Sequence, residues 1–217
     1  NISQQDILHS PYKNFLVDLD NTLIFTNAAN NAAYLSAANS LGFSTLFSKH
    51  NQFRITRTDL TSLSESVQQK IFIKKQKVYH SFLNQTILNE ALFQLLKNSN
   101  RDVFLVSNAD ENRANSLIEY HHLHDLFKEK IFCPSIPNKY EFALKRLNLL
   151  PNSVLIFDDD KLQLLGRIHN AAEAKSTVNL AKVSGLKSFN LDLMHGLPNQ
   201  TLEEALGDLR QAIELSP

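Results

Sequence analysis

The sequence is almost free of cysteine, because Cys133 is the single one among 217 residues. An internal disulfide is therefore excluded, and so is a metal cluster held by cysteines alone. Long hydrophobic runs are also missing, so no segment is long enough to span a bilayer. The first ten residues, NISQQDILHS, lack the charged and apolar regions of a signal peptide. We expect a cytoplasmic protein without a membrane partner.

An excess of charge of either sign is absent as well. Twenty-two basic residues balance 22 acidic ones, so no overall field attracts the chain to nucleic acid. Four lysines near the middle of the chain suggest an anion-binding patch, but we expect a solvated helix face, because few aromatic residues lie between them. Three histidines in EYHHLHDLF lack ligand partners at metal-site spacing and are expected to be ordinary helix-end residues. These residues are Lys70, Lys74, Lys75 and Lys77, and His121, His122 and His124.

What the chain does have is an apolar segment that runs directly into acidic residues. Phe15, Leu16 and Val17 are followed by Asp18 and Asp20. A continuous apolar run of this kind is typical of a strand buried on both faces of a parallel sheet. Ligand sites in such sheets lie at the carboxyl ends of the strands. An Asx turn is the alternative interpretation of these aspartates, since Asp and Asn often bond their own backbone there.

Three further apolar segments follow after residue 93. A short apolar strand is predicted over 102–107, another over 130–133, and a third over 154–157 that ends on Asp158, Asp159 and Asp160. A helix is predicted over 111–120, and a second over 139–147 with Asn138 as its cap. Because strands and helices alternate, we expect an α/β fold with a parallel, Rossmann-like sheet.

Residues 27–92 differ in character from the rest. Helical spacing is present up to Gly42, over the stretch from Ser64 to Leu83, and again from Thr86 to Lys97. The segment 27–85 shows little sign of strand. The predicted organisation is therefore a core formed by 1–26 and 93–217, with a small helical cap, 27–92, inserted after the first strand.

Four motifs in order resemble those of the haloacid dehalogenase (HAD) superfamily. The sequence DLDNTL, from Asp18, resembles its Asp-x-Asp-x-Thr motif. FLVSNAD supplies the strand that ends in a hydroxyl, at Ser107, and a lysine that opens a helix is present at Lys139. The acidic pair that ends a later strand is Asp158 and Asp159. The resemblance implies a HAD-like core whose cap closes over the site and selects small phosphorylated metabolites.

A cluster of carboxylates at one sheet edge requires a cation. Two carboxylates about 4 Å apart repel by roughly 4 kcal/mol at an effective dielectric constant of about 20. Mg2+ is the natural choice where all the ligands are oxygens and a phosphate is close. The resemblance implies that the ligands are the carboxylate of Asp18, the backbone carbonyl of Asp20, and Asp159 with Asp158 close by.

The resemblance also implies roles for single residues in a phosphatase reaction. Asp18 would attack phosphorus and form an aspartyl-phosphate, while Asp20 would act as general acid and then as general base. A carboxylate at position 20 favours phosphoryl transfer over dehalogenation. Phosphoglycomutase-like transfer to a second hydroxyl is the enzymatic alternative. The substrate would be held by Thr22, Ser107, the amide of Asn108 and Lys139.

Two positions and the C-terminal tail depart from the family pattern. Asn21 replaces a frequent glycine, and either residue tolerates the left-handed backbone that a sharp turn there requires. Tyr140 replaces the proline that usually follows the lysine, which we expect to alter only the helix start.

The third departure is the tail, 161–217. It resembles an internal fragment of the oxygen-independent coproporphyrinogen oxidase-like radical SAM proteins, which include heme chaperones, on LGRIHNAAEAK and SFNLDLMHGLPNQTLEEALGDLRQAIEL. Radical SAM chemistry needs three cysteines for its iron–sulfur cluster, and the chain has one. We expect a fusion whose tail forms a helix over 161–183, a strand over 188–194 and a last helix from Thr201. An inactive chimera is the non-enzymatic alternative.

Overall fold

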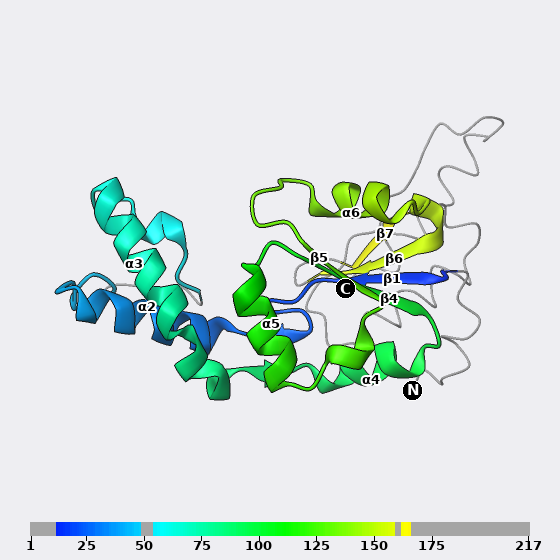
Figure 1. The fold of residues 1–217 in the computed structure, drawn as a ribbon, viewed down its shortest axis with the longest axis horizontal. Helices are drawn as coiled ribbons and strands as arrows, with labels where there is room; N and C mark the ends of the chain where they lie inside the picture. Colours follow the sequence, from blue (N-terminus) through cyan, green and yellow to red (C-terminus); the bar gives the residue numbers. More distant parts are fainter. Residues whose placement is uncertain (1–11, 49–53, 159–161, 166–217) are drawn as a thin grey trace, which may run out of the picture. The chain divides into compact units, whose positions relative to one another are not determined.

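The computed structural model describes residues 12–48, 54–158 and 162–165 (Figure 1). The strands are β1 (Asn14–Val17), β2 (Ile24–Phe25), β3 (Ile87–Leu88), β4 (Asp102–Ser107), β5 (Glu129–Phe132), β6 (Val154–Phe157) and β7 (Leu162–Leu165). The α-helices are α2 (Asn27–Ser40), α3 (Glu65–Val78), α4 (Glu90–Asn98), α5 (Glu111–Tyr120) and α6 (Lys139–Leu147). Short 3-10 helices are η1 (Arg57–Leu60), η2 (Tyr79–Gln85), η3 (His124–Leu126) and η4 (Pro151–Ser153).

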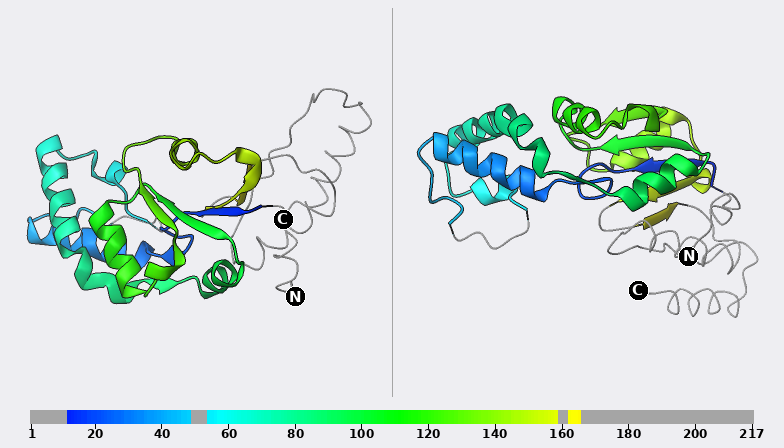
Figure 2. Two further views of the ribbon diagram at one scale, coloured as in Figure 1. Left: turned by 45° about the vertical axis from the view of Figure 1, so that its right-hand side comes forward. Right: turned by 90° about the horizontal axis from the view of Figure 1, so that it is seen from below.

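A five-stranded sheet forms the centre of the fold, in the order β5-β4-β1-β6-β7. β1 pairs in parallel with both β4 and β6, and β4 pairs in parallel with β5. Helices α6 and α4 lie on opposite faces of this sheet (Figures 1 and 2). The predicted α/β class with a parallel, Rossmann-like sheet is therefore confirmed.

The last strand departs from the prediction. Residues 162–165 form β7, which runs antiparallel to β6, whereas the sequence predicts a helix from residue 161. The open edge of β6 offers backbone groups for pairing, and this pairing outweighs the local helical pattern. The rest of that helix, and the strand and helix predicted beyond it, lie outside the described residues.

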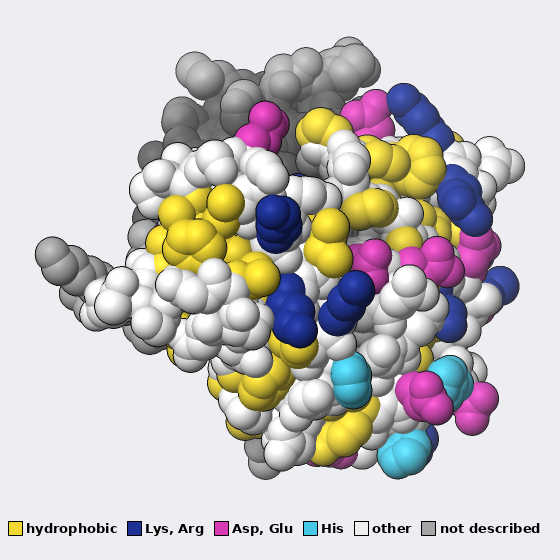
Figure 3. All heavy atoms as spheres, turned by 60° about the vertical axis from the view of Figure 1, so that its left-hand side comes forward, with side chains coloured by type: hydrophobic (Ala, Val, Ile, Leu, Met, Phe, Trp, Pro, Cys, Tyr) yellow, Lys and Arg dark blue, Asp and Glu magenta, His cyan; other side chains and the backbone are white. Residues whose placement is uncertain are grey.

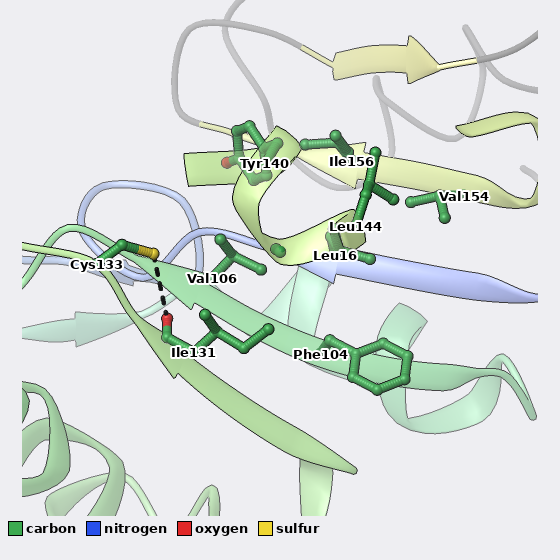
Figure 4. Close-up of a cluster of buried hydrophobic side chains, with 10 residues drawn as sticks. Leu16, Phe104, Val106, Ile131, Cys133, Tyr140, Leu144, Val154 and Ile156 are labelled. Atoms are coloured by element: carbon green, nitrogen blue, oxygen red, sulfur yellow. Dashed lines mark hydrogen bonds between the residues drawn. The ribbon is translucent and has the colours of Figure 1, made fainter. Parts of the chain in front are cut away.

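The core of the sheet is made by the apolar segments that the sequence indicates. All four residues of β1 and of β6 are buried, and the rings of Phe15 and Phe157 meet edge to face with centroids 5.4 Å apart. On one face, side chains from β1, β4, β5 and β6 pack against Tyr140 and Leu144 of α6 (Figure 4). This packing fixes the start of α6 beside the carboxyl ends of the strands.

The chain divides into two compact units, of which the second comprises Ile24–Leu88 and Ala109–His124. The sheet belongs to the first unit. In the second, α2 packs against α3 around a core that includes Tyr34, Ile55 and Ile71. The assignment of 27–92 as a cap stays a prediction.

Two details of the second unit correct the sequence analysis. A short antiparallel ribbon pairs β2 with β3, so the helix predicted from Thr86 begins only at Glu90. Its cap is Asn89, whose side chain accepts a hydrogen bond from the amide of Leu92. Ile87 and Leu88 are extended because they pair with Ile24 and Phe25, and this tertiary contact overrides their helical spacing.

The second correction concerns Lys75. The residue is only 5% exposed, so the predicted solvated face is wrong at this position, while Lys70 and Lys77 are exposed. Its ammonium lies 5.1 Å from the ring centroid of Tyr34 and 5.2 Å from that of Tyr79. Lys75 follows the buried Ile71 by one helical turn, so the inner face of α3 carries it into the core.

Side chains on the surface are mixed in type. Both basic and acidic side chains occur on the face drawn in Figure 3, among larger areas of uncharged surface. His121 follows the last residue of α5, and its Nε2 lies 2.7 Å from the hydroxyl oxygen of Thr86. Within the described residues, none of the helices has the length and apolar character needed to cross a membrane.

Candidate active site

The carboxyl ends of β1 and β6 lie level with one another, and the neighbouring strand β4 continues two residues further, to Ser107. Val17, the last residue of β1, is paired with Leu105 of β4 and with Phe157 of β6. The amide of Asp18 donates to the carbonyl of Phe157 over 2.9 Å. Asp18 and Asp158 therefore leave adjacent strands at the same height, as expected for parallel strands.

A tight turn follows β1. Asn21 has φ +59°, which confirms the left-handed backbone predicted for this position. The amide of Leu23 then donates to the carbonyl of Leu19. Asp20 is half-buried in this turn. Asp18 and Asp20, with one residue between them, therefore both lie at the carboxyl end of β1.

Thr22 is enclosed by the fold. It is fully buried, and its carbonyl accepts a hydrogen bond from the side-chain amide of Asn89 over 3.0 Å. Within the described part of the chain its hydroxyl has no hydrogen-bond partner. The observed contact ties the turn after β1 to the cap of α4, and a substrate-binding role for Thr22 stays a prediction.

Lys139 is brought to the acidic residues by the start of α6. Its Nζ lies 2.7 Å from Oδ1 of Asp18 and 3.7 Å from Oδ2 of Asp158. The side chains of Lys139 and Asp18 are each 11% exposed. Asn138 caps the helix by accepting a hydrogen bond from the amide of Glu141. The predicted lysine thus meets the first aspartate across a sequence separation of 121 residues.

The electrostatics of this cluster are dominated by burial. Burial raises the pKa of Asp18 from 3.8 to about 7, and the negative charges of Asp158 and Asp20 act in the same direction. The ammonium of Lys139 opposes them and lowers the pKa of Asp18. The ionised form of Asp18 is therefore disfavoured mainly by its burial, and a cation bound beside it would favour that form.

Ser107 and Asn108 end the neighbouring strand β4. Ser107 is 1% exposed, and its carbonyl accepts a hydrogen bond from the amide of Cys133. The side-chain amide of Asn108 donates to the carbonyls of Cys133 and Ile136, over 2.6 and 3.1 Å. Asn108 therefore holds the loop that leads to Lys139. The predicted contacts of Ser107 and of the Asn108 amide with a phosphoryl group stay predictions.

One residue of the cluster was not singled out as functional by the sequence analysis. The hydroxyl of Tyr140 hydrogen-bonds to Oδ2 of Asp158, and the ammonium of Lys139 lies 4.9 Å from the centroid of its ring. The expectation that this position alters only the helix start is therefore too narrow. No sequence pattern distinguishes such a tyrosine from an ordinary core residue.

The described residues account for only part of the predicted metal site. Asp159 lies outside them. Among those that the structure describes, His, Cys, Asp and Glu side chains form no group of three or more that could hold a metal ion. The ligand set predicted from the sequence includes a backbone carbonyl, that of Asp20, and so does not depend on three such side chains.

Comparison with known proteins agrees with this geometry. The family model for haloacid dehalogenase-like hydrolases matches residues 12–161. The chain belongs to this family. The matched part of this HAD-like hydrolase contains every residue of the cluster around Asp18.

Solved structures show the same fold at low identity. A HAD-like hydrolase from Bacteroides fragilis aligns with a TM-score of 0.57 at 16% identity, over 90% of this chain and 93% of that one. A predicted phosphoglycolate phosphatase from Haemophilus somnus aligns with a TM-score of 0.53 at 16% identity, over 68% of this chain and 77% of that one. At such identities the likeness shows the fold of the HAD-like chain alone.

A second similarity covers a minority of the chain. The heme chaperone HemW of Haemophilus influenzae is 93% identical over 61 residues, which are 28% of this HAD-like chain and 16% of HemW. The chain therefore spans a small fraction of that relative. The matched length is close to that of the tail, 161–217, and the family match ends where the tail begins. This is consistent with a fusion of two sequences.

Proposed function

We propose that the protein is a Mg2+-dependent phosphatase that hydrolyses a small phosphomonoester through an aspartyl-phosphate on Asp18. The observation that carries the proposal is the 2.7 Å contact between Lys139 and the buried carboxylate of Asp18, with Asp158 beside them. A buried carboxylate at the end of a central strand, paired with a lysine at a helix start, is suited to accept a phosphoryl group. The cytoplasmic location predicted from the sequence belongs to the same proposal.

The residues present fit a magnesium ion. Burial is the main cause that raises the pKa of Asp18, and the negative charges of Asp158 and Asp20 add to it. Three carboxylates therefore face the ammonium of Lys139 at this edge, and a divalent cation would balance the remaining negative charge. All of the donors are oxygens, as Mg2+ prefers. The carboxylate of Asp18, the backbone carbonyl of Asp20, and Asp158 with Asp159 would hold the ion. When bound, it would offset the negative charge of the phosphoryl oxygens.

The proposed reaction has two steps, each with a named proton carrier. In the first, a carboxylate oxygen of Asp18 attacks phosphorus and the bond to the ester oxygen breaks. Asp20 gives its proton to the leaving oxygen. In the second, water attacks phosphorus, Asp20 takes its proton, and the bond to Asp18 breaks to release phosphate. Lys139 stabilises the charge that develops on the phosphoryl oxygens.

Release of phosphate from a panel of small phosphate esters tests this proposal. We expect Mg2+-dependent release by the wild type and none above background by Asp18→Asn. Asp102→Asn is the matched control, because this carboxylate belongs to the same sheet but pairs with Lys128 at the surface. Equal release by Asp18→Asn and the wild type would remove Asp18 as the nucleophile.

Two further measurements address the alternatives. Phosphorus NMR of the products distinguishes hydrolysis, which yields inorganic phosphate, from transfer to a second hydroxyl of a sugar phosphate. Thermal melting at millimolar Mg2+ distinguishes a formed site from an inactive chimera, because a bound ligand stabilises the folded state. An unchanged melting temperature together with no phosphate release would favour the chimera.

A further inference from the structure

Tyr140 makes contacts that core packing does not require. The residue is 8% exposed, and its ring belongs to the apolar cluster beneath α6 (Figure 4). A phenylalanine would fill that space equally well. The hydroxyl nevertheless reaches Oδ2 of Asp158, and the ring lies under the ammonium of Lys139. The side chain therefore joins the packed core to two charged members of the site.

The position of Tyr140 in α6 explains how it reaches them. It is the second residue of the helix, after Lys139, and side chains in the first turn lean toward the helix start. The carboxyl end of β6 lies beside this turn. Contacts from both Tyr140 and Lys139 converge on the same oxygen of Asp158, so two neighbours in α6 contribute to the orientation of that carboxylate.

Asp158 needs such support more than Asp18 does. It is the first residue after β6, and its side chain is 22% exposed, twice the value for Asp18. A carboxylate with that much exposure exchanges its protein contacts for water unless a neighbour holds it. The neutral hydroxyl of Tyr140, anchored in the core, holds the carboxylate of Asp158 without adding charge to the cluster. Outer partners of this kind orient metal-binding side chains and raise the affinity of the site.

We propose that Tyr140 is a positioning residue, which fixes the carboxylate of Asp158 through its hydroxyl so that the acidic edge is preformed for a divalent cation. This inference rests on the proposed function, because it assigns Asp158 to the proposed metal site. It adds a residue that acts on the site from the interior of the sheet and does not itself touch the substrate.

A double-mutant cycle on the metal-free protein tests the contact. The free energies of unfolding of the wild type, Tyr140→Phe, Asp158→Ala and the double variant are measured in urea. Each single change removes the same charge-assisted hydrogen bond. We expect the combined change in the unfolding equilibrium constant to differ from the product of the single changes by about tenfold. If the double variant changes the unfolding equilibrium constant by the product of the two single changes, the proposal is overturned.

Calorimetric titration with MgCl2 then tests the positioning role. We expect the affinity for Mg2+ to fall about tenfold in Tyr140→Phe. Tyr12→Phe serves as the matched control, since Tyr12 is also buried in the sheet unit but precedes β1, at the opposite end of that strand from the site. An affinity equal to that of the wild type in Tyr140→Phe would overturn the inference.

The two experiments keep this inference separate from the proposed function. If the wild type binds Mg2+ and Tyr140→Phe binds it equally well, the positioning role fails while the phosphatase proposal stands. If the wild type binds no Mg2+, the metal site itself is refuted and the positioning role falls with it. If the double-mutant cycle shows coupling and Tyr140→Phe binds Mg2+ more weakly than the wild type, both the positioning role and the metal site are supported.

Discussion

The two units of this protein each bury a lysine, and they do so in different ways. Lys139, in the sheet unit, lies 2.7 Å from Asp18 and 3.7 Å from Asp158. Lys75, in the second unit, lies 5.1 and 5.2 Å from the ring centroids of two tyrosines. The first ammonium is set among carboxylates, which need its charge. The second lies over the electron-rich faces of two aromatic rings, which attract a cation.

The difference separates a reactive environment from a structural one. In the proposed reaction, the contacts of Lys139 with the carboxylates would change as a phosphoryl group binds, so this lysine would act on the reaction. A lysine packed between rings contributes mainly to the folding of α2 against α3. Burial alone therefore does not identify a functional lysine, whereas the chemistry of its neighbours does.

The largest effect is expected from removing the charge of Lys139. Lys139→Met should lower phosphate release by about 10³-fold, because the ammonium that lies 2.7 Å from Asp18 would no longer offset the charge on the phosphoryl oxygens. The rate of phosphate release at saturating Mg2+ measures this. A loss of less than about tenfold would show that Lys139 is not part of the machinery.

A pH-dependent effect on stability follows from Asp18. Its carboxyl has a pKa of about 7 in the folded protein and 3.8 as its ordinary value, so the folded state binds the proton more tightly than the unfolded state between these pH values. The free energy of unfolding of the metal-free protein should therefore fall as pH rises from about 4 to 7. The three-unit shift corresponds to at most about 4 kcal/mol.

Urea unfolding of the wild type and Asp18→Asn across this range isolates that contribution. The difference in the free energy of unfolding between the wild type and Asp18→Asn should change steadily from about pH 4 to 7 and level off above pH 7. Mg2+ should restore stability to the wild type at pH 7 and above, because the ion favours the ionised carboxylate. A difference that does not vary with pH would contradict the raised pKa.

A smaller effect is expected at the other buried lysine. Lys75→Met keeps much of the volume and removes the charge, so the lost cation–π contacts are largely compensated by the lower cost of burying an apolar side chain. The free energy of unfolding should change by about 1 kcal/mol or less, and the affinity for Mg2+ should stay within about twofold of the wild type. A large loss of Mg2+ affinity in Lys75→Met would contradict the structural role assigned to Lys75.

The smallest effect concerns His121 in the second unit. Burial lowers its pKa, and the charge of His122 acts in the same direction. The unfolded state therefore binds a proton more tightly than the folded state below pH 6.5, and stability should fall as pH drops through this region. Because the side chain is only half-buried, the loss should stay below about 1 kcal/mol. His121→Gln should remove this dependence in urea unfolding at pH 5.5 and 7.5.

Much of the sheet unit could be predicted because its signals are local. The apolar strands ending in Asp18, Ser107 and Asp158 follow from composition, and parallel pairing then places their ends along one edge. The helix start at Lys139 follows from the cap at Asn138. The left-handed backbone at Asn21 could be expected from the family resemblance, because this position often holds glycine.

The features that could not be predicted depend on contacts between distant segments. Tyr140 reaches Asp158 across 18 residues, and nothing in the neighbouring sequence indicates where a tyrosine hydroxyl will find its partner. Lys75 is buried because α2 brings Tyr34 to it, although its own segment is rich in exposed lysines. β7 forms on the edge of β6 against the helical pattern of its sequence. In each case tertiary packing decided what local spacing could not.

The antiparallel pairing of β7 has a consequence for the origin of the molecule. Four residues of extended main chain cover the edge of β6, and ladder bonds of this kind are formed by amides and carbonyls that every residue except proline supplies. Segments of many different sequences could therefore cover this edge, provided that they carry no proline at a paired position. The pairing is thus compatible with a fusion of two sequences just after the final acidic motif.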